Sequence, residues 1–220
     1  MNRSTRIVAA VLGVLFGISG LSHGFFEVRQ GNTPTEGLLI DAIHPSMQMW
    51  AYGGETAFTL IPNFLFTGLA AITVSIAIIV WCVRYLDTRH GASVFLGLFV
   101  LLFLVGGGIG QIAFFVPGWA FATRINKPLT VWRRILPEGL RGPLARIWPF
   151  TAALAAVLVL IALEIAIFGF FPGFTDPDRL LTLVMVLLGS ALLLFGLSFV
   201  SAFADDMNHN PLPLNPSVAR

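Results

Sequence analysis

The sequence has little charge for its length. Asp, Glu, Lys and Arg together make up 11% of its 220 residues, whereas soluble domains carry about 25%. Apolar residues make up 56%, and the mean hydropathy is +0.86. A chain with so little polar surface cannot keep a soluble globule of this size in water, so the sequence predicts that lipid surrounds most of it. The formal net charge of +2 gives no support to a nucleic-acid partner.

Cysteine is nearly absent as well. Cys82 is the only one, which excludes an internal disulfide and any metal site built on several cysteines. The sequence also lacks the H-E-x-x-H zinc motif, the G-x-x-x-x-G-K-[ST] phosphate loop and the nucleophile elbow of hydrolases. We therefore predict no cofactor, and the pattern favours a protein without catalytic activity over an enzyme.

Long apolar runs are what the sequence does contain. A helix of about 20 apolar residues crosses the roughly 30 Å hydrocarbon core of a bilayer. Such runs predict four full spans, near residues 7–26, 59–85, 147–171 and 180–204. The first run follows Arg3 and Arg6 in the manner of a signal peptide, but its glycine pattern favours an uncleaved helix. We expect an all-α, polytopic transmembrane helical bundle in a single domain, residues 1–209, with a mobile Pro-rich tail at 210–220.

A fifth apolar stretch, residues 93–122, is broken by glycine. It includes Gly106, Gly107 and Gly108 in succession, and each glycine weakens a helix by about 1 kcal/mol relative to Ala. The stretch is therefore either one long kinked fifth span or a Gly-broken helical hairpin of two short helices.

The distribution of positive charge separates these alternatives, because cytoplasmic loops are enriched in Lys and Arg. With the amino terminus inside, a single crossing places five cations inside and eight outside. A hairpin that returns to the same side places eleven inside and leaves only Arg29 and Arg179 outside. We therefore expect the hairpin, both termini cytoplasmic, and a bacterial-type inner or plasma membrane.

The first span carries two features on adjoining faces. A stripe of small residues, which lets another helix approach closely, consists of Gly13, Gly17, Gly20 and Gly24. His23 and Glu27, one helical turn apart, lie beside this stripe near the outer end. An imidazole next to a carboxylate can carry a proton or bind a metal ion, and it can equally form a hydrogen-bonded pair without further function.

The loop at residues 28–58 is longer than a plain connection requires. We expect it to form a lid of interfacial structure over the mouth of the bundle. It adds His44 to His23 and Glu27 as weak candidates for metal ligands, although the spacing of these residues matches no compact metal motif.

Other polar residues are candidates for a pathway. Glu164 lies within the apolar residues 155–166, where a carboxylate costs a few kcal/mol and is expected to face the bundle interior. The glycine break, followed by Gln111, would expose backbone groups that are tolerated only inside protein or beside a wet cavity. Asp205 and Asp206 would either form an inner exit or cap and solvate the end of the last helix.

Residues 124–146 alternate cations with apolar residues, and their prolines should limit any helix to short pieces. This composition is typical of an interfacial segment, and each surface cation contributes roughly 1 kcal/mol of attraction to anionic headgroups. The cations expected to bind such headgroups are Arg124, Lys127, Arg133, Arg134, Arg141 and Arg146.

These features support three hypotheses of function. The first is a small transporter or channel-like protein for an ion, a proton-coupled solute or a small molecule. It requires a homo-oligomer built through the glycine stripe, because four spans rarely enclose a solute cavity alone. The second is a non-catalytic accessory or assembly subunit of another membrane complex, and a dry, sealed interior would favour it. The third, a lipid-acting membrane enzyme, has no motif in its support.

Overall fold

The computed structural model describes residues 1–210 and has the all-α class that the sequence predicts. Its helices in chain order are α1 (Arg3–Arg29), α2 (Phe64–Arg84), α3 (Gly91–Leu104), α4 (Ile112–Ala122), α5 (Thr130–Ile135), α6 (Glu138–Phe168) and α7 (Pro177–His209). The antiparallel strands β1 (Leu39–Asp41) and β2 (Thr56–Phe58), with the short helix η1 (Pro45–Met47) between them, lie in the α1–α2 loop. By length and composition α1, α2, α6 and α7 could each cross a membrane. Apart from Asn210, the predicted tail lies outside the described residues.

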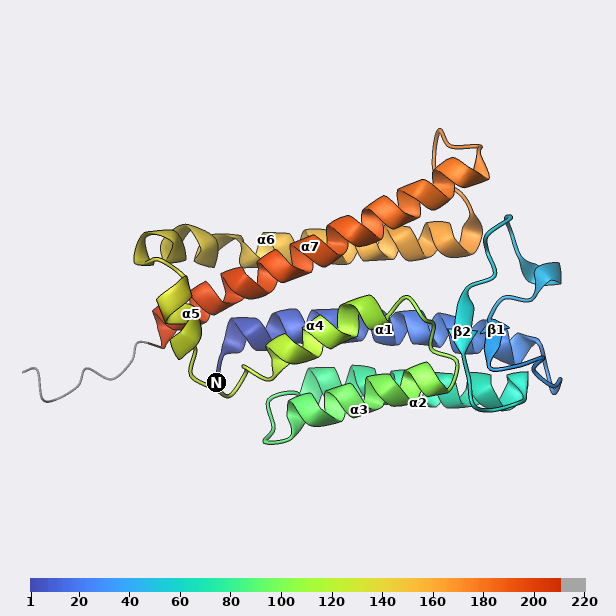
Figure 1. The fold of residues 1–220 in the computed structure, drawn as a ribbon, viewed down its shortest axis with the longest axis horizontal. Helices are drawn as coiled ribbons and strands as arrows, with labels where there is room; N and C mark the ends of the chain where they lie inside the picture. The colour runs from blue at the N-terminus through green and yellow to red at the C-terminus, as the bar shows by residue number, and fades with distance from the viewer. Residues whose placement is uncertain (211–220) are drawn as a thin grey trace, which may run out of the picture.

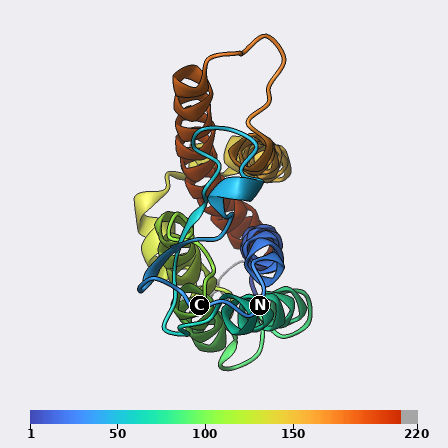
Figure 2. The same ribbon diagram turned by 90° about the vertical axis from the view of Figure 1, so that its right-hand side faces the viewer.

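The bundle has two ends (Figure 1). The strand end carries β1, β2, the turn between α3 and α4, and the connection from α6 to α7. The termini end carries the amino terminus, α5 and the end of α7. Figure 2 looks along the helices from the strand end, where the α1–α2 loop lies across the bundle.

Of the two arrangements considered for residues 93–122, the chain adopts the hairpin. α3 runs from the termini end toward the strand end and α4 returns (Figure 1). The turn between them needs glycine, because Gly106 and Gly108 have φ angles of 105° and 85°, a backbone region that other residues rarely adopt.

Two predicted boundaries are wrong. α2 begins at Phe64 instead of residue 59. The Thr59 and Leu60 amides donate to the carbonyls of Leu38 and Leu104, both at 2.9 Å, and Asn63 caps the helix by accepting from the Leu65 and Phe66 amides at 3.1 and 3.3 Å. α6 begins at Glu138 and passes through Pro143 and Pro149, so prolines do not confine this segment to short helices. Pro143 deprives the Gly139 carbonyl of its helical partner, and this residue is exposed to solvent or headgroups.

The glycine stripe of α1 packs inside the protein. A side chain at Gly17 would stand 2.6 Å from Ile79 of α2, and one at Gly24 would stand 2.7 Å from the Gly68 carbonyl. Gly13 and Gly20 likewise face α2 and α3. Because α2 and α3 occupy this face, the stripe is not free to assemble a homo-oligomer, which corrects the expectation from the sequence.

At the termini end, α7 caps α1. The buried carboxylate of Asp206 accepts hydrogen bonds from the Ser4 amide at 3.0 Å, and from the Thr5 amide and hydroxyl at 2.9 and 2.6 Å. Asp205 accepts from the Ser4 hydroxyl at 2.5 Å. A carboxylate is favoured at a helix amino terminus, whose free amides carry partial positive charge. Asp205 and Asp206 therefore act as a cap on another helix, and this geometry gives no support to an inner exit.

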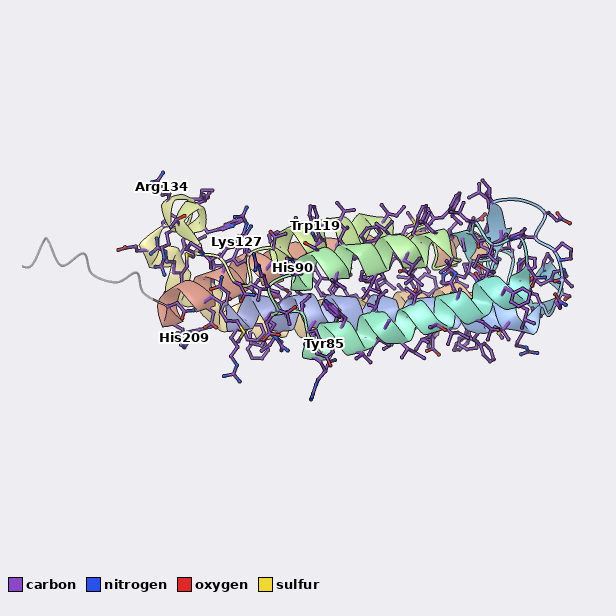
Figure 3. All side chains as sticks on the ribbon, turned by 90° about the horizontal axis from the view of Figure 1, so that it is seen from below. Tyr85, His90, Trp119, Lys127, Arg134 and His209 are labelled. Atoms are coloured by element: carbon purple, nitrogen blue, oxygen red, sulfur yellow. The ribbon has the colours of Figure 1, made fainter. Side chains whose placement is uncertain are left out.

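Two cations of the basic segment are also engaged within the protein. Arg133 donates to the carbonyls of Met207 and Asn210 at 2.9 and 2.6 Å, and Arg141 donates to those of Leu136 and Arg133. The other four cations, Arg124, Lys127, Arg134 and Arg146, are exposed. Figure 3 shows Lys127 and Arg134 at the termini end, whereas the side chains along the middle of the bundle are mostly carbon.

The cap on α1 leads to a prediction about stability. Replacing Asp206 by Ala leaves the Ser4 and Thr5 amides without partners at a buried site, and we expect a loss of about 1–3 kcal/mol, measured as a lower midpoint of thermal unfolding in detergent. Asp205→Ala on the same helix removes one bond from a partly exposed carboxylate and should cost less. A larger loss for Asp205→Ala than for Asp206→Ala would contradict the capping role.

Candidate functional site

The buried polar residues of α1 lie on one face near the strand end. Ser19, His23 and Glu27 follow at intervals of four residues, so they share a helical face. All three are buried, and no part of Glu27 is exposed. We call them, together with Gln111 and Glu55, the strand-end cluster.

The face that carries these residues packs along α4 and the glycine turn in a regular order. Phe16 lies on Phe114 with ring centroids 4.8 Å apart, and Ser19 accepts from the Gln111 amide nitrogen at 3.4 Å. One turn further on, a side chain at Gly108 would stand 2.7 Å from His23 Nε2. At the end of the row, a side chain at Gly106 would overlap the Glu27 carboxylate. The glycines therefore let the turn approach the imidazole and the carboxylate directly.

β2, α2 and the segment between them satisfy the backbone of this turn. The Gly106 amide donates to the Phe58 carbonyl at 2.9 Å, and the Leu60 amide donates to the Leu104 carbonyl at 2.9 Å. Thr67 of α2 donates to the Val105 carbonyl at 2.8 Å. The backbone at the glycine break was expected to lie either inside protein or beside a wet cavity. In this fold it is buried in protein.

Glu55 completes the cluster from the loop. Its Oε2 lies 3.4 Å from His23 Nε2, and its side chain is 25% exposed. Its φ of 53° makes it the only residue other than glycine with positive φ among residues 1–210, a strained conformation that costs about 1–3 kcal/mol and often occurs at functional sites. The sequence showed Glu55 as one of several loop acids. Nothing local linked it to His23, because the two residues meet only through the fold.

Three polar atoms in the cluster lack a partner. Within residues 1–210, neither carboxylate oxygen of Glu27 nor Nδ1 of His23 has a hydrogen-bond partner, although all three atoms are buried. An ionised carboxylate in that position would be costly. Glu27 is therefore suited to hold a proton or a small cation.

The candidate metal ligands are not brought together. His44 lies at the exposed start of η1, where its Nδ1 is 2.8 Å from the Ser46 hydroxyl. Over the part of the chain that the structure describes, no group of three or more His, Cys, Asp or Glu side chains could hold a metal ion.

The pathway candidates are also dispersed. Gln111 and the glycines 106, 107 and 108 join the strand-end cluster, but Asp205 and Asp206 lie at the termini end. Glu164 is exposed, on the same face of α6 as the exposed Val157 and Leu160, and it lies one turn before the helix ends at Phe168. The expectation that it faces the bundle interior is wrong, because both faces of α6 are apolar and the sequence could not show which one packs.

A layer of aromatic side chains separates the cluster from the termini end. It consists of Phe16, Phe95, Phe99, Phe114 and Phe115, all buried. The rings of Phe95 and Phe99 are 5.0 Å apart, and those of Phe99 and Phe115 are stacked at 5.3 Å. This phenylalanine layer makes the packing between α1, α3 and α4 apolar below the cluster.

Two spaces lie at the strand end. A small space of about 10 Å³ between α1, α6 and the loop is lined by Ser19, Ser22, His23 and Glu55 and by apolar side chains of the same three segments. An open pocket of about 620 Å³ lies nearby at the surface of the strand end, where Arg29, Glu36, Asp41 and His44 contribute to its walls.

The loop that carries Glu55 is tied to α6 and α7. Trp50 donates from Nε1 to the Ala166 carbonyl at 2.8 Å, and the Tyr52 hydroxyl donates to Asp178 at 2.5 Å. The bond to the Asp178 carboxylate raises the pKa of Tyr52.

Comparisons with protein-family models, with curated proteins and with solved structures find no match.

The glycine turn gives a prediction for the site. In Gly106→Ala the new methyl group meets the Glu27 carboxylate and the φ of 105° becomes strained, so we expect a loss of about 1–3 kcal/mol. The matched control is Gly110→Ala, four residues away, where nothing lies within 4 Å of the added atom. Thermal unfolding of both variants in detergent checks this, and equal midpoints would show that the turn does not press on Glu27.

Proposed function

We propose that this protein is a multi-pass membrane protein that acts as a non-catalytic subunit, associating laterally with another membrane component through α6. The observation that carries this proposal is the phenylalanine layer. Because buried rings fill the space between α1, α3 and α4 below the strand-end cluster, they interrupt the polar groups that would otherwise lead from that cluster toward the termini end. The polar groups named as a pathway serve instead as helix caps, as turn contacts or as surface groups.

The surface of α6 supports the proposal of lateral association. Carboxylates within transmembrane helices usually face protein or water rather than lipid. Glu164 instead lies among exposed apolar residues, about 6 Å from the end of its helix at 1.5 Å per residue. A partner helix with a hydrogen-bond donor at this depth would remove the carboxyl group from lipid. The partner is then a second copy of this chain or a different membrane subunit.

The proposed orientation places the strand end outside and both termini in the cytoplasm. Ten of the cations then lie in segments at or near the termini end, and Arg29 and Arg179 lie at the strand end, which agrees with the enrichment of Lys and Arg in cytoplasmic loops. The exposed Arg124, Lys127, Arg134 and Arg146 would then meet anionic headgroups of the inner leaflet.

Cysteine labelling in intact cells tests this orientation. Gly37 and Gly139 are both exposed, and nothing lies within 4 Å of an added side chain at either one. We expect a membrane-impermeant maleimide to label Gly37→Cys in intact cells and Gly139→Cys only after the membrane is permeabilised. The parent chain controls for Cys82, which is fully buried, and the reverse pattern would invert the topology.

Crosslinking in membranes tests lateral association. Val157 of α6 and Ile76 of α2 are exposed to nearly the same extent, 48% and 50%, so Val157→Cys and Ile76→Cys form a matched pair. We expect a discrete crosslinked product from Val157→Cys alone, and its yield should fall when Glu164→Leu is added. Equal products from both positions, or monomer only from both, would refute assembly through α6.

A second candidate function, proton-coupled transport, is favoured by the buried Glu27 carboxyl group without a partner. It requires the phenylalanine layer to open in another conformation. A transport assay in vesicles separates the two candidates, because Glu27→Gln should abolish transport but leave the Val157→Cys crosslink unchanged.

A further inference from the structure

We propose that Glu27 is a proton-binding site that exchanges protons with the outer side of the membrane through His23 and Glu55. This goes beyond lateral association, because it assigns a ligand to the strand-end cluster that the accessory role does not need.

The three side chains form a graded route from solvent to the protein interior. Glu55 is 25% exposed, His23 is 7% exposed and Glu27 is fully buried. Glu55 and His23 are in contact at 3.4 Å, and His23 and Glu27 occupy successive turns of the same helix face. A proton from outside therefore reaches Glu55 first and Glu27 last.

In each step the His23 imidazole takes up a proton at one ring nitrogen or releases one from the other. A neutral His23 protonated at Nδ1 accepts a proton at Nε2 from the Glu55 carboxyl group, which becomes a carboxylate. The imidazolium then releases the Nδ1 proton to the Glu27 carboxylate, which becomes a neutral acid. Neutral His23 is left protonated at Nε2, and the reverse transfers or a rotation of the ring restore the first state. The two ring nitrogens make histidine the usual residue for such a relay.

A small space assists the first step. The volume of about 10 Å³ beside His23 and Glu55 is close to the roughly 10–15 Å³ that a single water occupies on this measure. Ser19 and Ser22 supply hydroxyl groups to its wall. A water in this space would give Glu55 or His23 a further hydrogen-bond partner, and the 3.4 Å between the two side chains is itself short enough for direct transfer after a small movement.

The surroundings favour a proton over a metal ion. Each packed element presents neutral groups: Thr67 from α2, Gln111 from the turn, and Leu163 and Ile167 from α6. In the described part of the chain, neither Lys nor Arg forms an ion pair with Glu27, His23 or Glu55. The only titratable groups in the cluster are thus the three proposed carriers, and they do not form a group that could hold a metal ion.

Infrared spectroscopy of the full chain in lipid vesicles tests the proposal. We expect to observe the carbonyl stretching band of a protonated carboxyl group. This band should disappear in Glu27→Gln and persist in Glu164→Gln. If Glu27→Gln does not fold, Glu27→Asp should shift the band. After transfer to deuterated buffer, exchange of this band should slow by about tenfold or more in Glu55→Gln and in His23→Gln.

The matched control is Glu36→Gln, an exposed carboxylate of the same loop outside the cluster, which should leave the exchange rate unchanged. A band that survives Glu27→Gln, or that does not respond to Glu27→Asp when the first variant is unfolded, would overturn the proposal. If the band exchanges as fast in Glu55→Gln and in His23→Gln as it does in the parent chain, the proposed route is wrong. The vesicles contain only this chain, so these results do not depend on the crosslink through α6.

Discussion

α1 is enclosed by other helices along most of its length, so a polar group that it buries can find a partner only inside the bundle. In its most apolar stretch 61% of residues are buried, against 22% for α7. An unpaired buried polar group costs several kcal/mol in an apolar environment, so the neighbours of α1 are arranged around this need. Asp206 of α7 satisfies its first amides, and the glycine turn closes on its last polar side chains. Between these ends, glycines bring α2 close enough to exclude lipid.

The pair α6 and α7 is attached to this centre at both ends. At the termini end the attachment is the cap that Asp206 forms on α1, and at the strand end it is the loop whose Trp50 bonds to α6 and whose Tyr52 bonds to α7. Glu55 belongs to the same loop. The proposed partner contact on α6 and the proposed proton exchange at Glu27 therefore involve the same loop. The buried polar groups gather around α1, whereas the exposed large apolar side chains lie mainly on α2, α6 and α7.

Local patterns in the chain predicted a good part of this. Apolar runs located the four long helices, the successive glycines located the break at 105–111, and the spacing of His23 and Glu27 placed them on one buried face. Positions outside such patterns were harder to predict. Glu164 was expected inside because a carboxyl group avoids lipid, yet the face of α6 that packs is chosen by α7 and not by the polarity of α6. The start of α2 was missed because residues 59 and 60 bond to Leu38 and Leu104, which lie in distant segments of the chain.

By itself the sequence determined that this chain forms apolar helices, where the glycine break falls, and which polar residues share a face, because these depend on composition and on a period of 3.6 residues. Tertiary structure alone decided that Asp206 caps a helix about 200 residues away, that α2 covers the glycine stripe, and that Glu55 meets His23. Such contacts join distant segments, and a partner for a buried polar group can come from any of them. Only the packing of the whole bundle selects which one is near.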